Sequence, residues 1–574
     1  MSPKRVNSNF DFDMDDNDTV GKKSPPVNKL VNGVVDYKGR PVLRSKSGCW
    51  RSAYFIIGVE VAERFAYYGA SASLMIYLTK RLKQSTVTAA ENVNVWSGTA
   101  SLLPLLGSFI ADGFIGRYRM IIFASLLYVM ALALLAFSTL LPSDCKNAVD
   151  TSSCSPHIQV IMFFISLYLM AFAQGGHKPC VQAFGADQFD ADDPEELKAK
   201  SSFFNWWYFG LCFGSIVGIF VISIIQENLS WGMGFGIPCI IMGFALIIFL
   251  LGTMTYRFAE RIEGKNGFVR IGRVFVNAVR NWRTTNVTIS SEEESRQGSH
   301  QFRFLNKALL SHDGSNKDGT FCNIDEVEEA KAVIRLVPIW VSCLAYGIVF
   351  AQAATFFTKQ AATMDRSIGS HFHIPAAALQ GFIGLSIMIL IPVYDTVLVP
   401  LTRSITNKPS GITMLQRIGT GIVISIISMV LAALVETKRL KTAHEHGLLD
   451  DPSATIPMKI WWLVPQYLLA GASDVFTIVG MQEFFYGEMP SDLKSVGLAL
   501  YLSVMGIGSF LSSFVISVVH KTTSRNGQDG WISNNLNRAH IDYFYYLLAG
   551  ISFGALLIFI YAAKSYIYNR GRAS

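Results

Sequence analysis

The sequence predicts an all-α membrane protein whose twelve transmembrane helices form two six-helix lobes. The chain has 574 residues, of which 51% are hydrophobic and only 16% are charged, whereas charged residues make up about 25% of typical soluble domains. Its mean hydropathy is +0.34. This composition excludes a disordered, collagen-like or disulfide-scaffold protein. The net charge of +7 is small for the length, so we attribute it to cytosolic basic loops and expect no nucleic-acid partner.

Twelve apolar runs reach the length of about 20 residues that a helix needs to cross a bilayer core of about 30 Å. We place them at 52–78, 94–112, 119–142, 158–182, 203–226, 230–253, 332–357, 374–400, 412–436, 459–486, 495–519 and 542–568. An even number of spans puts both termini on one side of the membrane.

Hydrophilic segments divide the chain into four parts. Residues 1–48 are polar, contain an acidic cluster and lack the early apolar run of a signal peptide, so we predict a disordered cytosolic tail. Residues 49–253 form the first predicted lobe and residues 332–574 the second. The basic segment 254–331 between them is predicted to be a cytosolic linker, since positive loops stay inside.

The two halves share a weak internal repeat. Asp112 lies at the end of the second run and is followed by Arg117, while Asp395 lies near the end of the eighth and is followed by Arg403. Corresponding motifs in two six-helix halves are typical of two-lobed transporters, so we predict cytosolic gate motifs at Asp112, Arg117 and Asp395. Coincidence is the alternative, because an acid and a base are common at cytosolic helix ends.

Three charged residues, Glu60, Glu63 and Arg64, lie within the first run. At about 100° per residue they share one helix face. Each costs about 2.5–3.5 kcal/mol in lipid, and a Leu or Ile returns only about 0.3–0.6 kcal/mol, so we expect them to face a wet cavity or one another. One interpretation is a static ion-pair cluster. We favour a protonation switch, because two carboxylates beside one guanidinium leave one acid free to bind a proton.

Two further charges lie in apolar runs of opposite halves, Lys178 in the fourth and Asp474 in the tenth. An ion pair between them would bridge the lobes and couple ligand binding to their rocking. The alternative for Lys178 is that its side chain extends to the membrane interface. His177, next to Lys178, is interpreted as a packing residue.

The cysteines and histidines predict few special sites. Cys145 and Cys154 lie in one short polar loop, and they form a disulfide only if that loop faces an oxidising compartment; free thiols are the alternative. His444-Glu445-His446 has no further ligands nearby in sequence, so we interpret it as a solvated loop and expect no metal site.

A series of motifs along the chain carries a family resemblance. They are Glu60-Val-Ala-Glu63-Arg64, the stretch around Ala111-Asp112, Gly185-Ala-Asp187-Gln188-Phe189-Asp190, Phe203-Phe204-Asn205-Trp206-Trp207-Tyr208-Phe209, Arg303-Phe-Leu305, Lys408-Pro-Ser-Gly411, Gln416-Arg417-Ile418-Gly419 and Gln482-Glu483-Phe484-Phe485-Tyr486. With them the sequence, from about residue 36 to about 568, resembles the plant nitrate/peptide transporter family, a branch of the proton-coupled oligopeptide transporters in the major facilitator superfamily.

The resemblance implies the major facilitator fold and alternating access driven by a proton gradient, with Glu60, Glu63 and Arg64 in proton coupling. It also implies that Lys178 and Asp474 form a salt bridge in the substrate cavity. Asp474 stands where many relatives have Glu, and its shorter side chain loses one methylene of reach.

Two departures from a nitrate-transporting relative bear on the substrate. Phe350 replaces its nitrate-binding histidine, and a phenyl ring cannot donate a hydrogen bond to an anion. Met120 replaces its phosphorylated threonine, so that switch is missing. We expect Phe350 and Tyr68 to form cavity walls, and nitrate, peptides, hormones and specialised metabolites all stay open as substrates.

The expected function is proton-coupled symport of a small anionic or zwitterionic solute. The alternative is a substrate-sensing receptor with the transporter fold and little net transport, although the buried carboxylates count against it. No set of nucleophile, base and orienting group points to an enzyme, so we expect no catalytic residues and no cofactor. The expected partners are the solute, protons and the lipid bilayer, in the plasma membrane or the tonoplast with both termini in the cytosol.

Overall fold

The protein is described from a computed structural model. The described residues are 30–141, 156–190, 193–259, 267–282, 302–309, 322–369, 372–406, 412–489, 494–524 and 530–566. Cys145 and Cys154 lie outside them.

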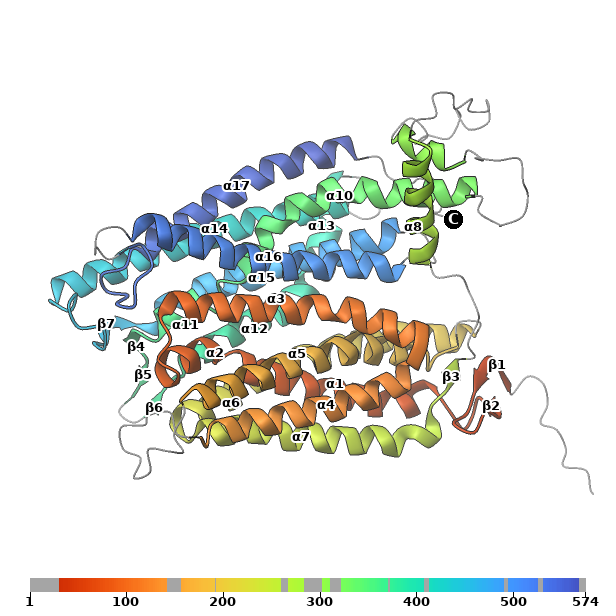
Figure 1. Cartoon of the computed structure of the whole chain (residues 1–574), viewed down its shortest axis with the longest axis horizontal. Helices are drawn as coiled ribbons and strands as arrows, with labels where there is room; N and C mark the ends of the chain where they lie inside the picture. The colour runs from red at the N-terminus through yellow and green to blue at the C-terminus, as the bar shows by residue number, and fades with distance from the viewer. Residues whose placement is uncertain are drawn as a thin grey trace, which may run out of the picture.

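Two bundles of long, roughly parallel helices make up most of the described chain, one above the other in Figure 1. The first bundle contains α1 (Cys49–Ser71), α3 (Thr86–Ile110), α4 (Arg117–Ser138), α5 (Pro156–Ala186), α6 (Pro194–Asn228) and α7 (Trp231–Leu251). The second contains α10 (Ile324–Phe350), α12 (Gly381–Val393), α14 (Met414–Glu445), α15 (Val464–Glu488), α16 (Lys494–Thr523) and α17 (Ile541–Ser565). The predicted fold class, two six-helix lobes, is confirmed.

Among the described residues, eleven helices are long and apolar enough to cross a membrane. They match the second to twelfth predicted runs. The exception is α1, because every 18-residue window of it contains Glu60, Glu63 and Arg64. Short helices extend several spans: α2 (Leu74–Ile76) and η2 (Tyr77–Arg81) follow α1, and η7 (Ala376–Gln380) and η9 (Ile460–Leu463) precede α12 and α15.

The helix ends define two ends of the molecule. At the linker end, α7 passes through η5 (Gly252–Thr255) into the connecting segment, and α10 begins. At the far end, β4 (Met364–Asp365) pairs with β7 (Ile456–Lys459), and β5 (Ser367–Ile368) pairs with β6 (Phe372–His373), near α11 (Phe356–Ala361). These short strands are minor additions to an otherwise helical fold (Figure 1).

The prediction of a disordered tail over 1–48 is wrong from Leu30 onward. Strands β1 (Leu30–Val35) and β2 (Pro41–Leu43) form a hairpin, and β1 also pairs with β3 (Phe258–Ala259). The Asp36 carboxylate closes the turn by accepting from the backbone amides of Lys38 and Arg40, at 2.8 and 2.9 Å. The third strand of this sheet, β3, lies more than 200 residues away in sequence from β1, so local composition does not reveal that pairing.

Part of the predicted linker 254–331 is also helical. Helix α10 begins at Ile324 rather than near 332, because Asn323 and Glu326 form a capping box. Helix α8 (Gly267–Arg280) runs across the ends of the bundle helices (Figure 1) and packs on η6 (Arg303–Leu309) and on α10.

The internal repeat predicted from Asp112 and Asp395 has a backbone counterpart. A π-helical turn follows α3 at η3 (Ala111–Ile115), and another follows α12 at η8 (Tyr394–Leu398), before α13 (Val399–Thr406). Such turns are rare and occur often at functional sites. Both lie in equivalent places of the two lobes, so the repeat is structural. The side chains of Asp112 and Asp395 lie outside what the structure describes.

Candidate functional site

The three charged residues of α1 form one buried cluster. Arg64 Nε lies 3.1 Å from Glu60 Oε1, and Arg64 Nη2 lies 2.5 Å from Glu63 Oε2. All three side chains are at most 2% exposed. Two carboxylates therefore share a single guanidinium inside the first lobe, as their spacing on one helix face predicts.

Hydrogen bonding in this cluster is incomplete. The contacts to Arg64 are ion pairs that lack hydrogen-bond alignment. Glu60 Oε2 and both carboxylate oxygens of Glu63 make no aligned hydrogen bond to a described group, and neither do the two ring nitrogens of His177 nearby. Buried polar atoms are usually paired, and an unpaired one costs about 1–3 kcal/mol. Several buried polar atoms of the cluster are therefore able to form a further hydrogen bond.

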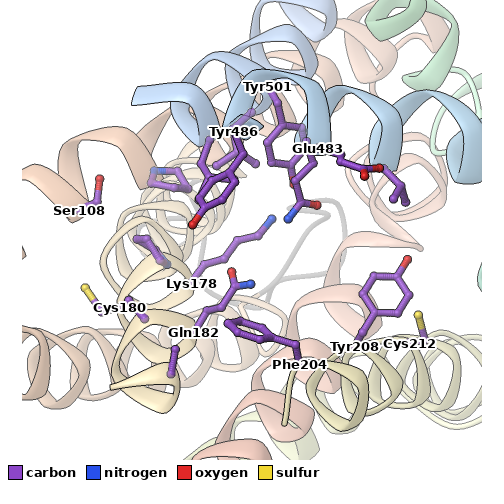
Figure 2. Close-up of a pocket in the computed structure, with 18 of the residues that line it drawn as sticks. Ser108, Lys178, Cys180, Gln182, Phe204, Tyr208, Cys212, Glu483, Tyr486 and Tyr501 are labelled. Atoms are coloured by element: carbon purple, nitrogen blue, oxygen red, sulfur yellow. The ribbon is translucent and has the colours of Figure 1, made fainter. Parts of the chain in front are cut away.

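A cavity of about 1070 Å³ lies between the two lobes. In Figure 2, Lys178 and Gln182 of α5 point across it towards Tyr486 of α15 and Tyr501 of α16. The polar and charged residues that line it are Ser108, Arg117, Lys178, Gln182, Tyr208, Gln482, Glu483, Tyr486 and Tyr501. Most of the remaining wall is aliphatic or aromatic. Lys178 is a cation held on the wall of a largely apolar chamber.

Lys178 and Asp474 do not form an ion pair in this structure. Asp474 is buried, and its carboxylate accepts a hydrogen bond from the Tyr346 hydroxyl of the same lobe. It lines a separate small pocket, while Lys178 faces the large cavity. The predicted bridge is therefore absent from this conformation.

The predicted wall residues lie elsewhere. Phe350 lines the small pocket beside Asp474, not the large cavity. Tyr68 packs edge-on to Tyr67, with ring centroids 5.2 Å apart, and against a small core cluster that includes Ile219. Neither residue is among those that line the large cavity.

At the far end, the two lobes are joined. The contacts run from Thr86 N to Asn534 Oδ1 (2.8 Å), from Asn94 Nδ2 to Ser512 Oγ (3.0 Å), from Gln380 Nε2 to the Ala72 carbonyl (2.9 Å) and from Arg366 Nη1 to Glu227 Oε2 (2.5 Å). The cavity, in contrast, is lined by Arg117 at the start of α4 and by Tyr486 near the end of α15, both at the linker end. The chamber therefore opens towards the linker end and is closed at the far end.

Two ion pairs described at the linker end each lie within one lobe. Arg117 Nη1 lies 2.6 Å from Asp187 Oδ2 in the first lobe. In the second, Arg417 Nη1 lies 3.2 Å from Glu483 Oε2, and its guanidinium sits 4.1 Å from the centre of the Tyr394 ring. Sequence reasoning assigned a gate role to Arg117 but missed Asp187 and Glu483, although both lie in motifs that carry the resemblance.

Two six-helix bundles around a chamber that opens at one end define a two-lobed membrane transporter. The sequence model of the POT family matches residues 118–532. The chain belongs to the POT family of transporters, and its relatives include many plant NRT1/PTR proteins.

Two relatives and two solved structures illustrate this similarity. The chain is 61% identical to Protein NRT1/PTR family 5.10 of Arabidopsis thaliana, over 94% of this chain and 97% of the relative, and 54% identical to family member 5.12 over the same shares. An autoinhibited POT family peptide transporter superimposes with a TM-score of 0.69 at 23% identity, covering 91% of this chain and 99% of that one. The POT family transporter PepTSo superimposes with a TM-score of 0.64 at 23% identity, covering 90% and 98%. These structures share the fold.

Proposed function

We propose that the protein is a proton-coupled symporter of a small anionic or zwitterionic solute. The observation that carries this proposal is the cluster of Glu60, Glu63 and Arg64, fully buried in α1 with unpaired carboxylate oxygens. A cluster that served only to hold helices together would have its hydrogen bonds completed, because each unpaired oxygen costs free energy. Two acids on one guanidinium have room for one proton, which is what coupling to a proton gradient requires.

Lys178 links the proton site to the solute. It lies on α5, which packs against α1, and its ammonium group points into the chamber (Figure 2). An anionic group of the solute would bind Lys178 while the chamber is open. When the lobes close around the solute, Lys178 and Asp474 approach each other and form the bridge that the open conformation lacks, and this exchange of partners couples binding to the conformational change.

The chamber favours an organic solute with an apolar body over a bare inorganic anion. Its volume of about 1070 Å³ is near the upper end of ordinary ligand pockets, which measure about 300–1,000 Å³. The apolar and aromatic residues that line it include Pro104, Leu105, Phe204, Phe209, Met388, Ile391, Val479, Leu498 and Leu502. The preferred substrate is therefore an organic acid or zwitterion that carries aliphatic or aromatic groups.

We assign the linker end to the cytosol. The segment between the lobes is rich in Lys and Arg, and such segments stay on the cytosolic side. The conformation described is then open to the inside, with both termini cytosolic, in the plasma membrane or the tonoplast. The relatives support a transporter, and no observation favours the receptor alternative.

An uptake screen tests the proposal. Oocytes that express the protein receive nitrate, a dipeptide or a panel of aromatic and aliphatic carboxylic acids, each at acidic and neutral external pH. We expect acid-stimulated uptake of at least one organic acid or zwitterion, and we expect Glu63→Gln to abolish that stimulation while surface expression is kept. The matched control is Glu195→Gln, an exposed acid at the start of α6, which should transport normally. Full acid-stimulated uptake by Glu63→Gln would refute the coupling assignment.

A further inference from the structure

His177 lies beside the charged cluster, and the proposed mechanism gives it no role. Its side chain is 0% exposed, and both ring nitrogens lack a hydrogen-bond partner among the described groups. A neutral imidazole carries one donor and one acceptor, and leaving both unmade in a buried site costs free energy. The interpretation of His177 as an ordinary packing residue does not account for this.

The neighbours of His177 are the acids of the cluster. One ring nitrogen of His177 and one carboxylate oxygen each of Glu60 and Glu63 all lie within 4.8 Å of one another. The other charged or titratable groups here are Arg64, Tyr67 and Tyr68 on α1, Tyr128 on α4, whose hydroxyl faces Glu63, and Lys178 next along α5. Unpaired oxygens and unpaired ring nitrogens thus face each other across the contact between α1 and α5.

The local packing of α5 holds His177 in this position. Gly175 packs against the backbone of α3, where a Cβ would come within 2.7 Å of Leu103, and Gly176 faces Met120 of α4. These two glycines let α5 approach α3 and α4 closely. The imidazole that follows them is enclosed on the side of α1.

A divalent metal is the first ligand that two carboxylates and a histidine suggest. Here the Arg64 guanidinium already contacts both carboxylates, and Lys178 adds a second positive charge beside them. A dication would enter against two fixed cations. A single proton adds less charge and needs only one acceptor, so it fits the site better.

We propose that His177 accepts the hydrogen bond of the proton carried by Glu60 or Glu63. This inference rests on the proposed function and deepens it. When both acids are ionised, their oxygens are held by Arg64. When a proton binds one carboxylate oxygen, the neutral acid loses its attraction to the guanidinium, and its new O–H donates to a ring nitrogen of neutral His177. The O–H bond forms on loading and breaks on release, and the proton comes from one aqueous side and leaves to the other.

His177 is on this view a positioning residue for the proton. Removal of the acceptor raises the free energy of the protonated Glu60 or Glu63, because its buried O–H is left without a hydrogen-bond partner. The variant His177→Leu keeps an apolar volume and has no acceptor, while His177→Gln retains an acceptor oxygen. Comparison of the two variants separates a hydrogen-bonding role of His177 from a packing role. If His177 only packs, His177→Leu should resemble the wild type more closely than His177→Gln does.

Infrared difference spectroscopy of the purified full-length protein reads the site without any substrate. Acidification should produce the carbonyl stretching band of a protonated carboxylic acid, which Glu60→Gln or Glu63→Gln removes. We expect His177→Leu to shift this band to higher frequency, as for a carboxylic acid without an acceptor, and His177→Gln to restore most of the wild-type position. An unchanged band in His177→Leu would overturn the proposal. If His177→Leu does not fold, ¹⁵N-histidine spectra of the wild type, assigned by the signal missing from His177→Gln, must show one ring nitrogen acquiring a hydrogen bond on acidification, or the proposal is wrong.

Two further measurements separate the remaining possibilities. In the uptake assay, His177→Leu should need an external pH lower by about one unit for half-maximal uptake, equivalent to a tenfold higher proton concentration, and His177→Gln should need less of a change. Titration with Zn²⁺ and Mn²⁺ should show no binding that His177→Leu removes; such binding would assign a metal site and overturn the proposal. The wild type could transport none of the solutes while His177→Leu still shifts the carboxylic acid band. That result would refute the proposed symport and leave the hydrogen bond to His177 established.

Discussion

Each lobe buries a charge cluster on a membrane-spanning helix, and the two clusters are completed to very different degrees. On α14, Arg439 contacts Glu436 through Nε and Nη2 at 2.8 and 2.7 Å. Gln360 donates to the same carboxylate at 2.7 Å, and Arg439 donates to Asn537 Oδ1 and to the Leu536 carbonyl, both at 2.8 Å. Both charged side chains are 0% exposed. Every charged atom of this pair has a partner.

The charged residues of the α1 cluster have a similar spacing in sequence, but their hydrogen bonds are incomplete. Glu436 and Arg439 are three residues apart, and Glu60 and Arg64 are four residues apart, so each pair lies about one helical turn apart. Yet Glu60 and Glu63 together leave three carboxylate oxygens without a hydrogen bond. The difference separates a static ion pair from one that exchanges a proton, because only unsaturated groups gain a bond when a proton arrives. The first two of the four predictions that follow test this difference, and the other two extend the comparison to a buried acid and to an exposed ion pair.

Breaking the saturated pair should have the largest effect on stability. Arg439→Met leaves the Glu436 carboxylate buried without its counter-charge, which costs about 3–5 kcal/mol. We expect a large fall in the thermal unfolding temperature of the purified protein and loss of most surface expression. The matched control is Lys438→Met, an exposed neighbour on the same helix turn whose ammonium lies over the Trp462 ring. A melting temperature within a degree or two of wild type for Arg439→Met would contradict a structural role.

Breaking the unsaturated cluster should cost less, and the cost should depend on pH. Arg64→Met removes the guanidinium that Glu60 and Glu63 share, but each acid is able to take up a proton, and a neutral acid needs no counter-charge. We expect a smaller loss of thermal stability than for Arg439→Met, and a loss that shrinks as the pH falls. Thermal unfolding across a pH series checks this. A loss that is as large as for Arg439→Met and independent of pH would make the two clusters equivalent.

The third effect concerns the buried acid of the second lobe. Tyr346→Phe removes the hydroxyl that donates to Asp474, and a hydrogen bond to a charged group is worth about 1.5–3 kcal/mol. We expect a moderate fall in the unfolding temperature and an altered pH dependence of uptake. The control is Tyr467→Phe, because the Tyr467 ring is also fully buried but its hydroxyl makes no described hydrogen bond to a charged group. Equal effects of the two substitutions would mean that the loss of a buried hydroxyl, not the bond to Asp474, is what matters.

The sequence predicts the helices well because apolar length and helix ends are local properties. Within the described residues, each of the twelve predicted runs lies mainly on a helix or a short series of helices. The charged face of α1 follows from a spacing of three and four residues. The hairpin of Leu30–Val35 with Pro41–Leu43 was missed, and the third strand of its sheet, Phe258–Ala259, lies far along the chain, where local pattern does not reveal the pairing.

The sequence also could not predict which buried polar groups have hydrogen-bond partners, because those partners come from other helices. The sequence gives no sign that Gln360 and Asn537 complete the Glu436 cluster, or that His177 faces Glu60 and Glu63 unpaired. The predicted bridge between Lys178 and Asp474 depends on which conformation is present, and one sequence specifies several. The spacing in the sequence therefore identifies where the charged residues lie, and only the packed structure shows which of them have all their hydrogen bonds.

The smallest effect is expected at an exposed ion pair of the far end. Lys459 Nζ lies 2.7 Å from Asp365 Oδ2, and the Ser367 backbone amide donates to Asp365 Oδ1 at 3.0 Å. The Lys459 ammonium, followed by Ser367, lowers the pKa of Asp365 below its usual value. A group with a lowered pKa stabilises the folded state above the pKa of its unfolded form, about 3.9 for Asp, and the contribution is lost as the pH falls towards the folded value.

Lys459→Met should therefore lower the unfolding temperature slightly at neutral pH and not at strongly acidic pH. The Lys459 side chain is 56% exposed, so water and salt screen the pair, and its worth is at most about 1 kcal/mol. The same scan in high salt should reduce the difference further, and Lys441→Met, an exposed lysine whose nearest acid lies 3.9 Å away, is the control. A salt-independent loss as large as that of Arg439→Met would show that burial is not what separates the strong ion pairs of this protein from the weak ones.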